Sequence, residues 1–231
     1  MSKLLAVRSL QRMALCLALC LALCLAAGPA DARHHGHHPS GGAAAVAGQF
    51  NYFLLSLAWS PSYCLIHQED RAQCSRGFGF VLHGLWPQNA DGGYPEDCAR
   101  SAPLPAAAAA RGQTLFPSPQ LMQHEWQRHG TCTGMDALGY FNTADRALAI
   151  VKIPPAFEAP RVGRSMRAAE VVAAFRAANA ALPTNGLVVA CKRDELSEVR
   201  VCLSKELAPI ACGREVRNNC PDVALRIPAA R

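Results

Sequence analysis

The stretch HEWQRHGTC at residues 124–132 gathers four side chains that could do chemistry: His124, Glu125, Arg128 and His129. It first suggests the zinc-protease signature H-E-x-x-H, in which two histidines four residues apart share one helix face. Here the histidines are five residues apart, so their directions on an α-helix differ by roughly 140°. Two histidines oriented in this way do not hold one zinc ion without distortion. The spacing therefore counts against a metalloprotease site.

The residues that share a helix face in this stretch are instead Glu125 and His129, with Arg128 beside them and His124 on a neighbouring edge. This set suits phosphoryl chemistry. A neutral imidazole can remove a proton from an attacking hydroxyl, and a protonated imidazole can give one to the leaving oxygen. A cation can stabilise the extra charge on phosphorus, and a carboxylate can orient the base. A further histidine is required, and His83 at the end of a predicted strand is the candidate.

A structural interpretation of the same residues stays open at this point. A His–Glu pair at a helix end is often an exposed ion pair or a cap, and a single strand histidine such as His83 is often a core residue with its hydrogen bonds satisfied. Short motifs produce false positives. Spacing alone does not decide between catalysis and structure.

These residues must be positioned by a mixture of strands and helices. Residues 50–59 are apolar on both alternating faces, which is typical of a central strand covered on both sides. Residues 88–119 are rich in Gly, Pro, Ala and Asp and predict long surface loops. The other predicted strands are 78–87, 186–191, 198–203 and 223–228, and the predicted helices are 119–129 (with Gly130 as C-cap), 137–152 and 165–182 (with Ser165 as N-cap). Because the two kinds do not alternate strictly, we expect an α+β fold.

The first 32 residues have the parts of a secretory signal peptide. A basic start precedes an apolar core at residues 13–27, and Ala30-Asp31-Ala32 supplies a cleavage site. An uncleaved membrane anchor is the alternative, and the short apolar run counts against it. Residues 33–48 are small, polar and Gly-rich, which predicts a flexible arm. Its histidines could hold a metal loosely, but a solvated tail is favoured: His34, His35, His37 and His38.

The chain after the signal has the length of one ordinary domain, predicted to span residues 49–231. Removal of the signal takes away Lys3, Arg8, Arg12 and Asp31, so the formal net charge falls from +6 to +4. This mildly basic charge permits attraction to a polyanion without demanding it.

Cysteine usage points to an oxidising compartment. Three of the eleven cysteines lie in the signal, and the even number that remains favours four disulfides. Zinc binding is disfavoured because no C-x2-C pair exists. Spacing does not choose among the pairings of Cys64, Cys74, Cys98, Cys132, Cys191, Cys202, Cys212 and Cys220.

Two segments, FVLHGLWPQ and HEWQRHGTC, together resemble the active-site segments of the ribonuclease T2 family, and FLLSLAWSPSYC resembles its first core strand and turn. The resemblance runs from about Gln49 to Pro228. It implies an α+β fold with a central, mostly antiparallel sheet packed with helices. It also implies disulfides between Cys64 and Cys74, Cys98 and Cys132, Cys191 and Cys220, and Cys202 and Cys212.

The resemblance implies a role for each candidate residue. His83 would be the general acid that protonates the departing 5′ oxygen, and His129 the base that removes the 2′-OH proton. His124 would bind the scissile phosphate, and Glu125 would support the base and polarise the phosphate. Arg128 stands where the family usually has lysine. Because arginine is a planar fork and lysine a point charge, we expect activity to survive with altered phosphate geometry.

The resemblance also implies two base sites. Trp86 would stack on the base 5′ of the cut, with Tyr94 as a second stacking residue, although Trp86 could instead be a core residue beside the site. Gln88 stands where some members carry an acidic residue that favours adenine. Stacking tolerates any base, so we expect broad specificity. The second base site would use Gln49, Pro117, Ser118 and Gln120.

The implied activity is that of an exported, monomeric endoribonuclease, periplasmic or secreted, which needs no metal or cofactor. It would cleave single-stranded RNA by transphosphorylation to 2′,3′-cyclic phosphates and then hydrolyse these to 3′-phosphates. DNA lacks the 2′-OH and would not be cut, and no membrane contact is expected once the signal is removed. The alternatives are a metal-dependent hydrolase and an inactive relative that binds RNA. The filled catalytic positions argue against the second.

Overall fold

The computed structural model describes residues 46–100, 103–158 and 161–230. The predicted signal peptide and most of the predicted arm lie outside the described residues. The strands are β1 (Tyr52–Trp59), β2 (Phe80–Gln88), β3 (Arg164–Arg167), β4 (Leu187–Lys192), β5 (Glu195–Leu203) and β6 (Ala224–Ile227). The helices are α2 (Ser60–Cys64), α3 (Arg71–Cys74), α4 (Ala106–Gln113), α5 (Pro119–Arg128), α6 (Ala137–Ile150) and α7 (Ala168–Ala178), with 3-10 turns η1 (Gly130–Thr133) and η2 (Pro155–Phe157).

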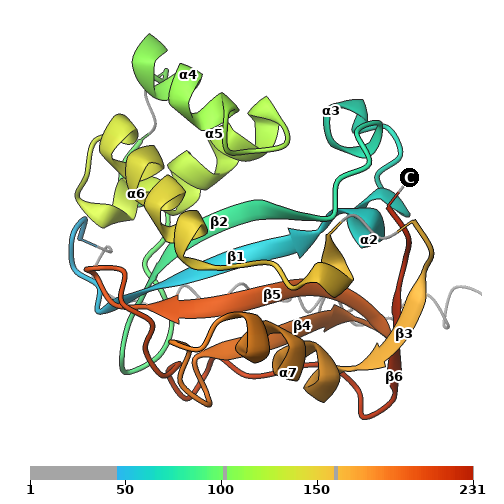
Figure 1. The fold of residues 1–231 in the computed structure, drawn as a ribbon. Helices are drawn as coiled ribbons and strands as arrows, with labels where there is room; N and C mark the ends of the chain where they lie inside the picture. The colour runs from blue at the N-terminus through green and yellow to red at the C-terminus, as the bar shows by residue number, and fades with distance from the viewer. Residues whose placement is uncertain (1–45, 101–102, 159–160, 231) are drawn as a thin grey trace, which may run out of the picture. The chain divides into compact units, whose positions relative to one another are not determined.

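The strands form one mixed sheet in the order β2-β1-β5-β6-β3, with β4 paired to β5 (Figure 1). Strand β1 is antiparallel to both β2 and β5, and β4 is antiparallel to β5. Only the short contact between β5 and β6 is parallel within the described chain. The predicted α+β class with a mostly antiparallel central sheet is confirmed.

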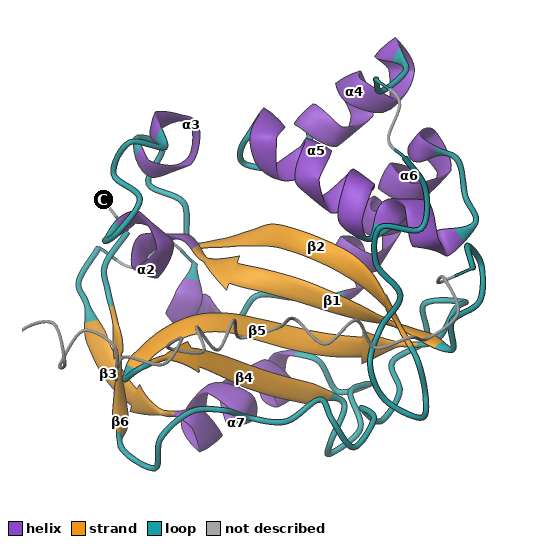
Figure 2. Cartoon of the chain, turned by 180° about the vertical axis from the view of Figure 1, so that it is seen from behind, coloured by secondary structure: helices purple, strands orange, loops and turns teal. Residues whose placement is uncertain are grey.

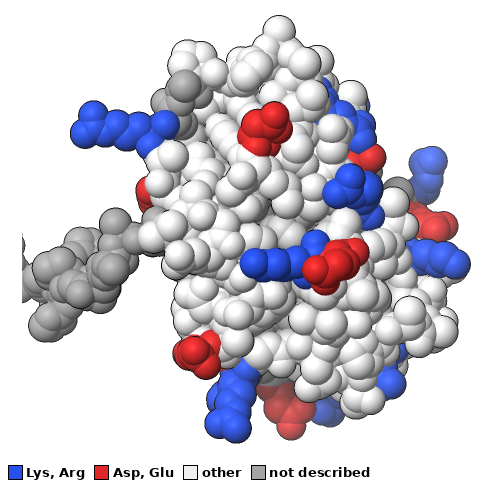
Figure 3. Space-filling model, turned by 90° about the vertical axis from the view of Figure 1, so that its left-hand side faces the viewer, with Lys and Arg blue, Asp and Glu red and all other residues white. Residues whose placement is uncertain are grey.

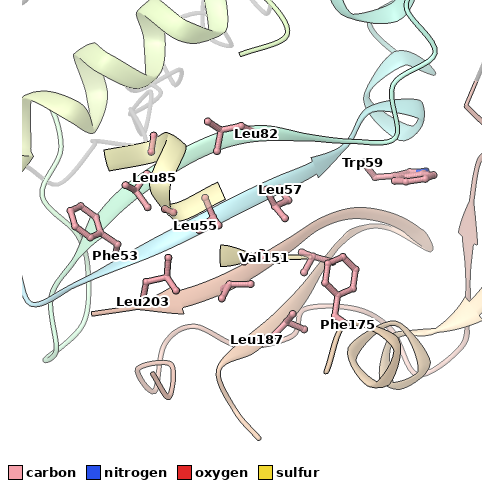
Figure 4. Packing of buried hydrophobic residues seen from close by; sticks show 14 of the residues in the cluster. Phe53, Leu55, Leu57, Trp59, Leu82, Leu85, Val151, Phe175, Leu187 and Leu203 are labelled. Atoms are coloured by element: carbon pink, nitrogen blue, oxygen red, sulfur yellow. The ribbon is translucent and has the colours of Figure 1, made fainter. Parts of the chain in front are cut away.

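The main core lies on one face of this sheet. Alternate residues of β1, such as Phe53, Leu55 and Leu57, are buried there with partners from β2 and β5 (Figure 4). Helices α6 and α7 cover that face, as the two opposite views of Figures 1 and 2 show. Phe141 of α6 and Phe175 of α7 belong to the same apolar cluster. On the other face of β1, Tyr52 and Leu54 form a smaller buried cluster with Cys202. Ser56 of β1 donates a hydrogen bond to Glu198, so part of this face is polar.

A β-bulge in β2 decides which side chains share this polar face. The pairing of β1 with β2 shifts by one residue between Ser56 and Leu57, and His83 is the residue of β2 left without a partner. In a regular strand, His83 and Trp86 would point to opposite faces because they are three residues apart. With the extra residue both point to one face, and their ring centroids lie 5.1 Å apart.

Two predictions of secondary structure were wrong. Residues 106–113, inside the predicted loop 88–119, form α4, because the alanine-rich run has a high helix propensity. The predicted helix 165–182 begins only at Ala168, because residues 164–167 pair with β6. Ser165 is consequently not the N-cap, and its hydroxyl donates to the carbonyl of Leu225.

Four disulfides brace the fold, and they join the pairs that the resemblance implied. Cys64–Cys74 links α2 to α3, and Cys98–Cys132 ties the loop after β2 to η1. Two others hold the carboxy-terminal strands: Cys191–Cys220 and Cys202–Cys212. Among the described helices, none has the length and apolar character needed to cross a membrane.

Candidate active site

Helix α5 carries most of the candidate catalytic residues. The hydroxyl of Ser118 accepts a hydrogen bond from the amide of Leu121, and Pro119 occupies the first turn, where its missing N–H costs nothing. The helix ends at Arg128 with His129 as its C-cap. Gly130 is not the left-handed C-cap predicted, since the chain continues into η1. A glycine is needed there because a Cβ would meet the ring of Trp126.

Glu125 lies at the centre of the site with only 1% of its side chain exposed. Its Oε2 accepts a 2.6 Å hydrogen bond from Nε1 of Trp86, and its Oε1 lies 3.6 Å from Nε2 of His83. A Cβ at position 84 would overlap the Glu125 carboxylate, so Gly84 of the HGLWP segment allows this close approach. Burial raises the pKa of Glu125 to about 7, although the nearby charge of His83 opposes the shift.

The contacts of Glu125 differ from those that the resemblance implied. Its side chain was expected to support His129, but no hydrogen bond joins these two side chains among the described residues. Its neighbours are instead Trp86, His83 and, at 4.0 Å from Oε1, Nε2 of His124.

His83 is held between two carboxylates. Its Nδ1 lies 2.6 Å from Oε1 of Glu198, and its Nε2 faces Glu125. Burial lowers the pKa of His83, but the hydrogen bond and the charge of Glu198 outweigh burial and raise it above its ordinary value. The side chain keeps 31% of its surface exposed, so Nε2 can meet a ligand.

Glu198 is a residue of the site that sequence reasoning missed. It lies on β5, buried, and accepts hydrogen bonds from Nε of Arg200 at 2.6 Å and from the hydroxyl of Ser56 at 3.1 Å. Burial alone would raise the pKa of Glu198, yet the hydrogen bond and charge of His83, followed by those of Arg200, lower it to about 2. A signal was present in the segment EVRVC, where Glu198 and Arg200 alternate with valines in a predicted core strand.

His129 lies on the other side of the cluster and is 7% exposed. Its ring centroid is 5.2 Å from that of Trp86 and 6.0 Å from that of Tyr94. Its Nδ1 is buried and has no hydrogen-bond partner in the described part of the chain. Burial, then the charges of Arg128 and His124, lower the pKa of His129 to about 3, so its imidazole is neutral near pH 7.

Trp86 joins the two sides of the cluster. Its ring lies edge-on to His83 and tilted against His129, and the guanidinium carbon of Arg200 lies 5.2 Å from its centroid. With the hydrogen bond to Glu125, these contacts hold the half-buried indole in place. Stacking of Trp86 on a base stays a prediction.

Arg128 is paired with acidic residues outside the histidine cluster. Its guanidinium lies 2.5 Å from the carboxylate of Glu96 and 4.0 Å from that of Asp97, and it is hydrogen-bonded to Tyr94. Tyr94 is exposed beside His129, which leaves its ring accessible to a base. His124 is 57% exposed at the rim, and burial, followed by the charge of Arg128, lowers its pKa.

A cavity of about 720 Å³ opens on one side of the cluster. Its lining includes His83, His124, Ser118 and Gln120, but not His129. Gln88 is buried at the end of β2 and lines a separate cavity of about 400 Å³ with residues 89–93 and 213–217. Three of the predicted base residues thus line two separate cavities: Ser118 and Gln120 the larger, and Gln88 the smaller.

The structure does not bring all residues of the second predicted base site together. Ser118 and Gln120 line the larger cavity, whereas Pro117 is not among its lining residues. Gln49 is exposed, and the preceding Gly48 is hydrogen-bonded to the carbonyl of Cys132, so Gln49 lies beside η1 instead of the cavity. A role of Gln49 in base binding has no support here.

The described residues contain no group of three His, Cys, Asp or Glu side chains arranged to hold a metal ion. On the face in Figure 3, basic and acidic side chains are interspersed. The site itself gathers three histidines, two buried carboxylates and two arginines.

Comparison with known proteins agrees with this arrangement. Residues 50–212 match the model of the Ribonuclease T2 family. A ribonuclease of Aeromonas hydrophila is 36% identical over 202 residues, which cover 78% of this chain and 87% of the relative. Ribonuclease DdI of Dictyostelium discoideum is 29% identical over 192 residues, covering 76% of this chain and 80% of that protein.

Solved structures with the same fold include an RNase-related protein from Calystegia sepium, with a TM-score of 0.64 and 24% identity, covering 79% of this chain and 98% of that one. Ribonuclease MC1 from bitter gourd seeds has a TM-score of 0.56 and 21% identity, covering 78% of this chain and 100% of that one. The match of the family model over most of the domain, together with the similarity to the Aeromonas enzyme, shows that this chain belongs to the ribonuclease T2 family.

Proposed function

We propose that this ribonuclease cleaves single-stranded RNA by metal-independent transphosphorylation, with His83 as acid and His129 as base. The observation that carries the proposal is that two histidines, both in contact with the indole of Trp86, have pKa values shifted in opposite directions. The pKa of His83 is raised and that of His129 is lowered, so near pH 7 His83 is the more readily protonated of the two, whereas His129 is neutral and has a lone pair free for a proton. Such a separation of pKa values typically marks acid and base roles.

In the proposed reaction, His129 takes the proton of the ribose 2′-OH, and O2′ attacks the adjacent phosphorus. The bond between phosphorus and O5′ breaks as His83 gives its proton to O5′. The products are a 2′,3′-cyclic phosphate and a free 5′-OH end. In the slower second step, water attacks the cyclic phosphate with the two histidines in exchanged roles and yields a 3′-phosphate.

Glu198 would act as a positioning residue for His83. Its ionised carboxylate accepts a hydrogen bond from Nδ1 of His83, which keeps the transferable proton on Nε2. The hydrogen bonds from Arg200 and Ser56 in turn fix the carboxylate. A carboxylate–imidazole pair of this kind stabilises the imidazolium in which the acid must begin.

Glu125 and His124 would contact the scissile phosphate. With a pKa of about 7, Glu125 is partly protonated at neutral pH, and its Oε1 has no hydrogen-bond partner among the described residues. A protonated Oε1 could donate to a phosphate oxygen. His124 at the rim and the charge of Arg128 would add electrostatic stabilisation of the dianionic phosphorane.

Base recognition would be broad. The exposed ring of Tyr94 and the indole of Trp86 would stack on the base 5′ of the cut, with Gln88 nearby, and Ser118 with Gln120 would contact the base on the 3′ side. Two proteins of the same fold support nucleotide binding on this scaffold. RNase NT was solved with 5′-AMP, and a mutant of RNase MC1 with 5′-UMP.

The proposal includes export to the periplasm or the medium and action as a monomer without a cofactor. Four disulfides and the sequence of residues 1–32 support export. DNA would not be cut, because it has no internal nucleophile.

The test is cleavage of an RNA oligonucleotide by the oxidised protein in excess EDTA, with products identified by mass spectrometry. We expect unchanged cleavage and a 2′,3′-cyclic phosphate that appears before the 3′-phosphate. Loss of cleavage in the chelator would support a metal-dependent hydrolase instead. Binding without turnover would indicate an inactive RNA-binding relative.

A further inference from the structure

The cavity of about 720 Å³ extends well beyond the proposed catalytic groups. Its lining includes His83 and His124, Ser118 at the N-cap of α5, and Lys192 and Arg193 in the hairpin between β4 and β5. The lining also includes Gln73 of α3 and Gln120 of α5, two helices that stand apart in both views of the fold (Figures 1 and 2). Its volume lies towards the upper end of the roughly 300–1,000 Å³ usual for ligand pockets, so it has room for more than one base.

The position of the histidines defines the direction of a bound strand. His83 lines this cavity, whereas His129 contacts Trp86 and Tyr94 outside it. In the proposed reaction, His83 serves O5′ of the departing strand, and His129 serves the ribose on the 5′ side. A strand that uses both histidines therefore enters the cavity with the part that lies 3′ of the cut.

The lining of the cavity includes an aromatic pair. The rings of Tyr63 and His67 are stacked with centroids 4.3 Å apart and an angle of 21° between their planes. The phenol of Tyr63 is fixed by a hydrogen bond to Asp70, and Nδ1 of His67 lies 3.4 Å from Glu69. His67 remains 41% exposed, and such a preordered ring can stack on any base.

The hairpin between β4 and β5 carries a small net positive charge at the cavity. Arg226 is paired with both Asp194 and Glu195, so these three charges sum to −1, and with Lys192 and Arg193 the group sums to +1. Lys192 and Arg193 are exposed, and no ion pair engages either side chain within the described ranges. The φ of Arg193 is 57°, a conformation that favours glycine or asparagine in a tight hairpin. The backbone conformation therefore does not account for an arginine at this position.

We propose that this cavity binds the RNA strand 3′ of the cut over at least two nucleotides. The first base lies near Ser118, the second stacks on His67, and the following phosphate lies at Lys192 and Arg193. The proposal rests on the ribonuclease function proposed above. It adds a strand polarity and a preference for substrates longer than a dinucleotide.

The experiment compares kcat/KM for a dinucleotide with that for substrates extended by three nucleotides on the 3′ side or on the 5′ side. We expect the 3′ extension to raise kcat/KM by about tenfold, the order of one stacked base, and the 5′ extension to raise it less. In a Lys192→Ser/Arg193→Ser variant, the ratio of 3′-extended to dinucleotide kcat/KM should fall towards one. The log–log salt slope for the 3′-extended substrate should become less steep by about 0.7, as for one lost phosphate contact.

Matched variants distinguish a specific contact of Lys192 and Arg193 with phosphate from an effect of the protein's overall charge. Lys152→Ser/Arg176→Ser removes the same charge from exposed positions elsewhere, and its ratio should equal that of the unaltered protein. His67→Ala should lower the ratio, and His67→Phe, which retains a ring, should restore it. A Lys192→Ser/Arg193→Ser variant with an unchanged ratio would overturn the phosphate contact. An equal gain from the 5′ extension would overturn the polarity.

Binding separates failure of this proposal from failure of the proposed function. Fluorescence anisotropy measures the Kd of the same oligonucleotides with 2′-deoxyribose at the cut, which have no nucleophile. If no RNA is cleaved but 3′-extended probes still bind more tightly than the dinucleotide, the cavity assignment stands and the ribonuclease function fails. If RNA is cleaved but extension on the 3′ side does not lower Kd, the cavity assignment fails alone.

Discussion

Nδ1 of His83 and Oε1 of Glu198 lie 2.6 Å apart, although 115 positions separate the two residues in the chain. The carboxylate is buried and receives two further hydrogen bonds, so it cannot turn away from the imidazole without leaving Arg200 and Ser56 unpaired. This pair, instead of one within α5, fixes the tautomer of the proposed acid.

Replacement of Glu198 by Gln tests this pair. We expect kcat/KM to fall by roughly 10- to 100-fold, a fraction of what acid–base catalysis contributes. Because Glu198 raises the pKa of His83, its loss should lower that pKa. The basic limb of the pH profile of kcat/KM should therefore move to lower pH. Glu158→Gln, at an exposed position, is the control. A lower kcat/KM with an unmoved basic limb would reduce Glu198 to a purely structural role.

The two histidines should be distinguishable by the leaving group of the substrate. His83→Ala and His129→Ala should each lower kcat by about 10²–10⁴-fold on RNA. A uridine 3′-aryl phosphate with a good leaving group needs no acid, so it should restore turnover of His83→Ala but not of His129→Ala. Rescue of His129→Ala instead would reverse the assignment. Circular dichroism should show that both variants fold.

Glu125 should make stability depend on pH in a defined direction. Its folded pKa of about 7 exceeds the ordinary value of 4.5, so the folded state binds more protons between these limits. Its contribution is therefore present below pH 4.5 and is lost as pH rises through 7. The difference in Tm between Glu125→Gln and the unaltered protein should therefore shift in favour of the variant as pH rises from 4.5 to 8. A constant Tm difference across this range would contradict the raised pKa.

Arg128 is held by Glu96 and Tyr94, which should limit its contact with phosphate. We expect Arg128→Lys to retain kcat/KM within about threefold, since a charge remains, and Arg128→Ala to lose roughly tenfold. Glu96→Gln frees the guanidinium and should lower KM for RNA. If Arg128→Ala had unaltered kinetics, the arginine would serve only the ion pair.

The disulfide between Cys98 and Cys132 should couple oxidation to activity, because it ties the loop that contains Glu96 to η1, the turn just after α5. A Cys98→Ser/Cys132→Ser variant lacks this cross-link, whose two cysteines are 34 positions apart in the chain. Without the closed loop, the free energy of unfolding should fall by about 3–4 kcal/mol. Urea denaturation should show this loss, with a higher KM for RNA below the unfolding transition. Equal stability of both forms would rule out the bracing role.

Much of the site can be predicted from the sequence because its information is local. The five-residue spacing of His124 and His129 argues against a shared metal ion, whatever the fold. Ser118-Pro119 sets the start of α5, and the chain after Arg128 sets its end. The helix face that carries Glu125 is therefore a local property of the sequence. The apolar alternation in β1 and the even number of cysteines likewise predict a braced core strand.

Other features depend on which strands pair and in which register, and no local pattern contains that information. Strand alternation alone would place His83 and Trp86 on opposite faces, and only the bulge against β1 brings them together. The charge of Glu198 is visible in the sequence, but its partner is set by the placement of β5 beside β1. Burial of Glu125 under β2 gives it a near-neutral pKa. The residue types with catalytic potential were thus readable along the chain, whereas their pairing, protonation and access were decided by tertiary contacts, because burial and distance between remote strands set electrostatic energies.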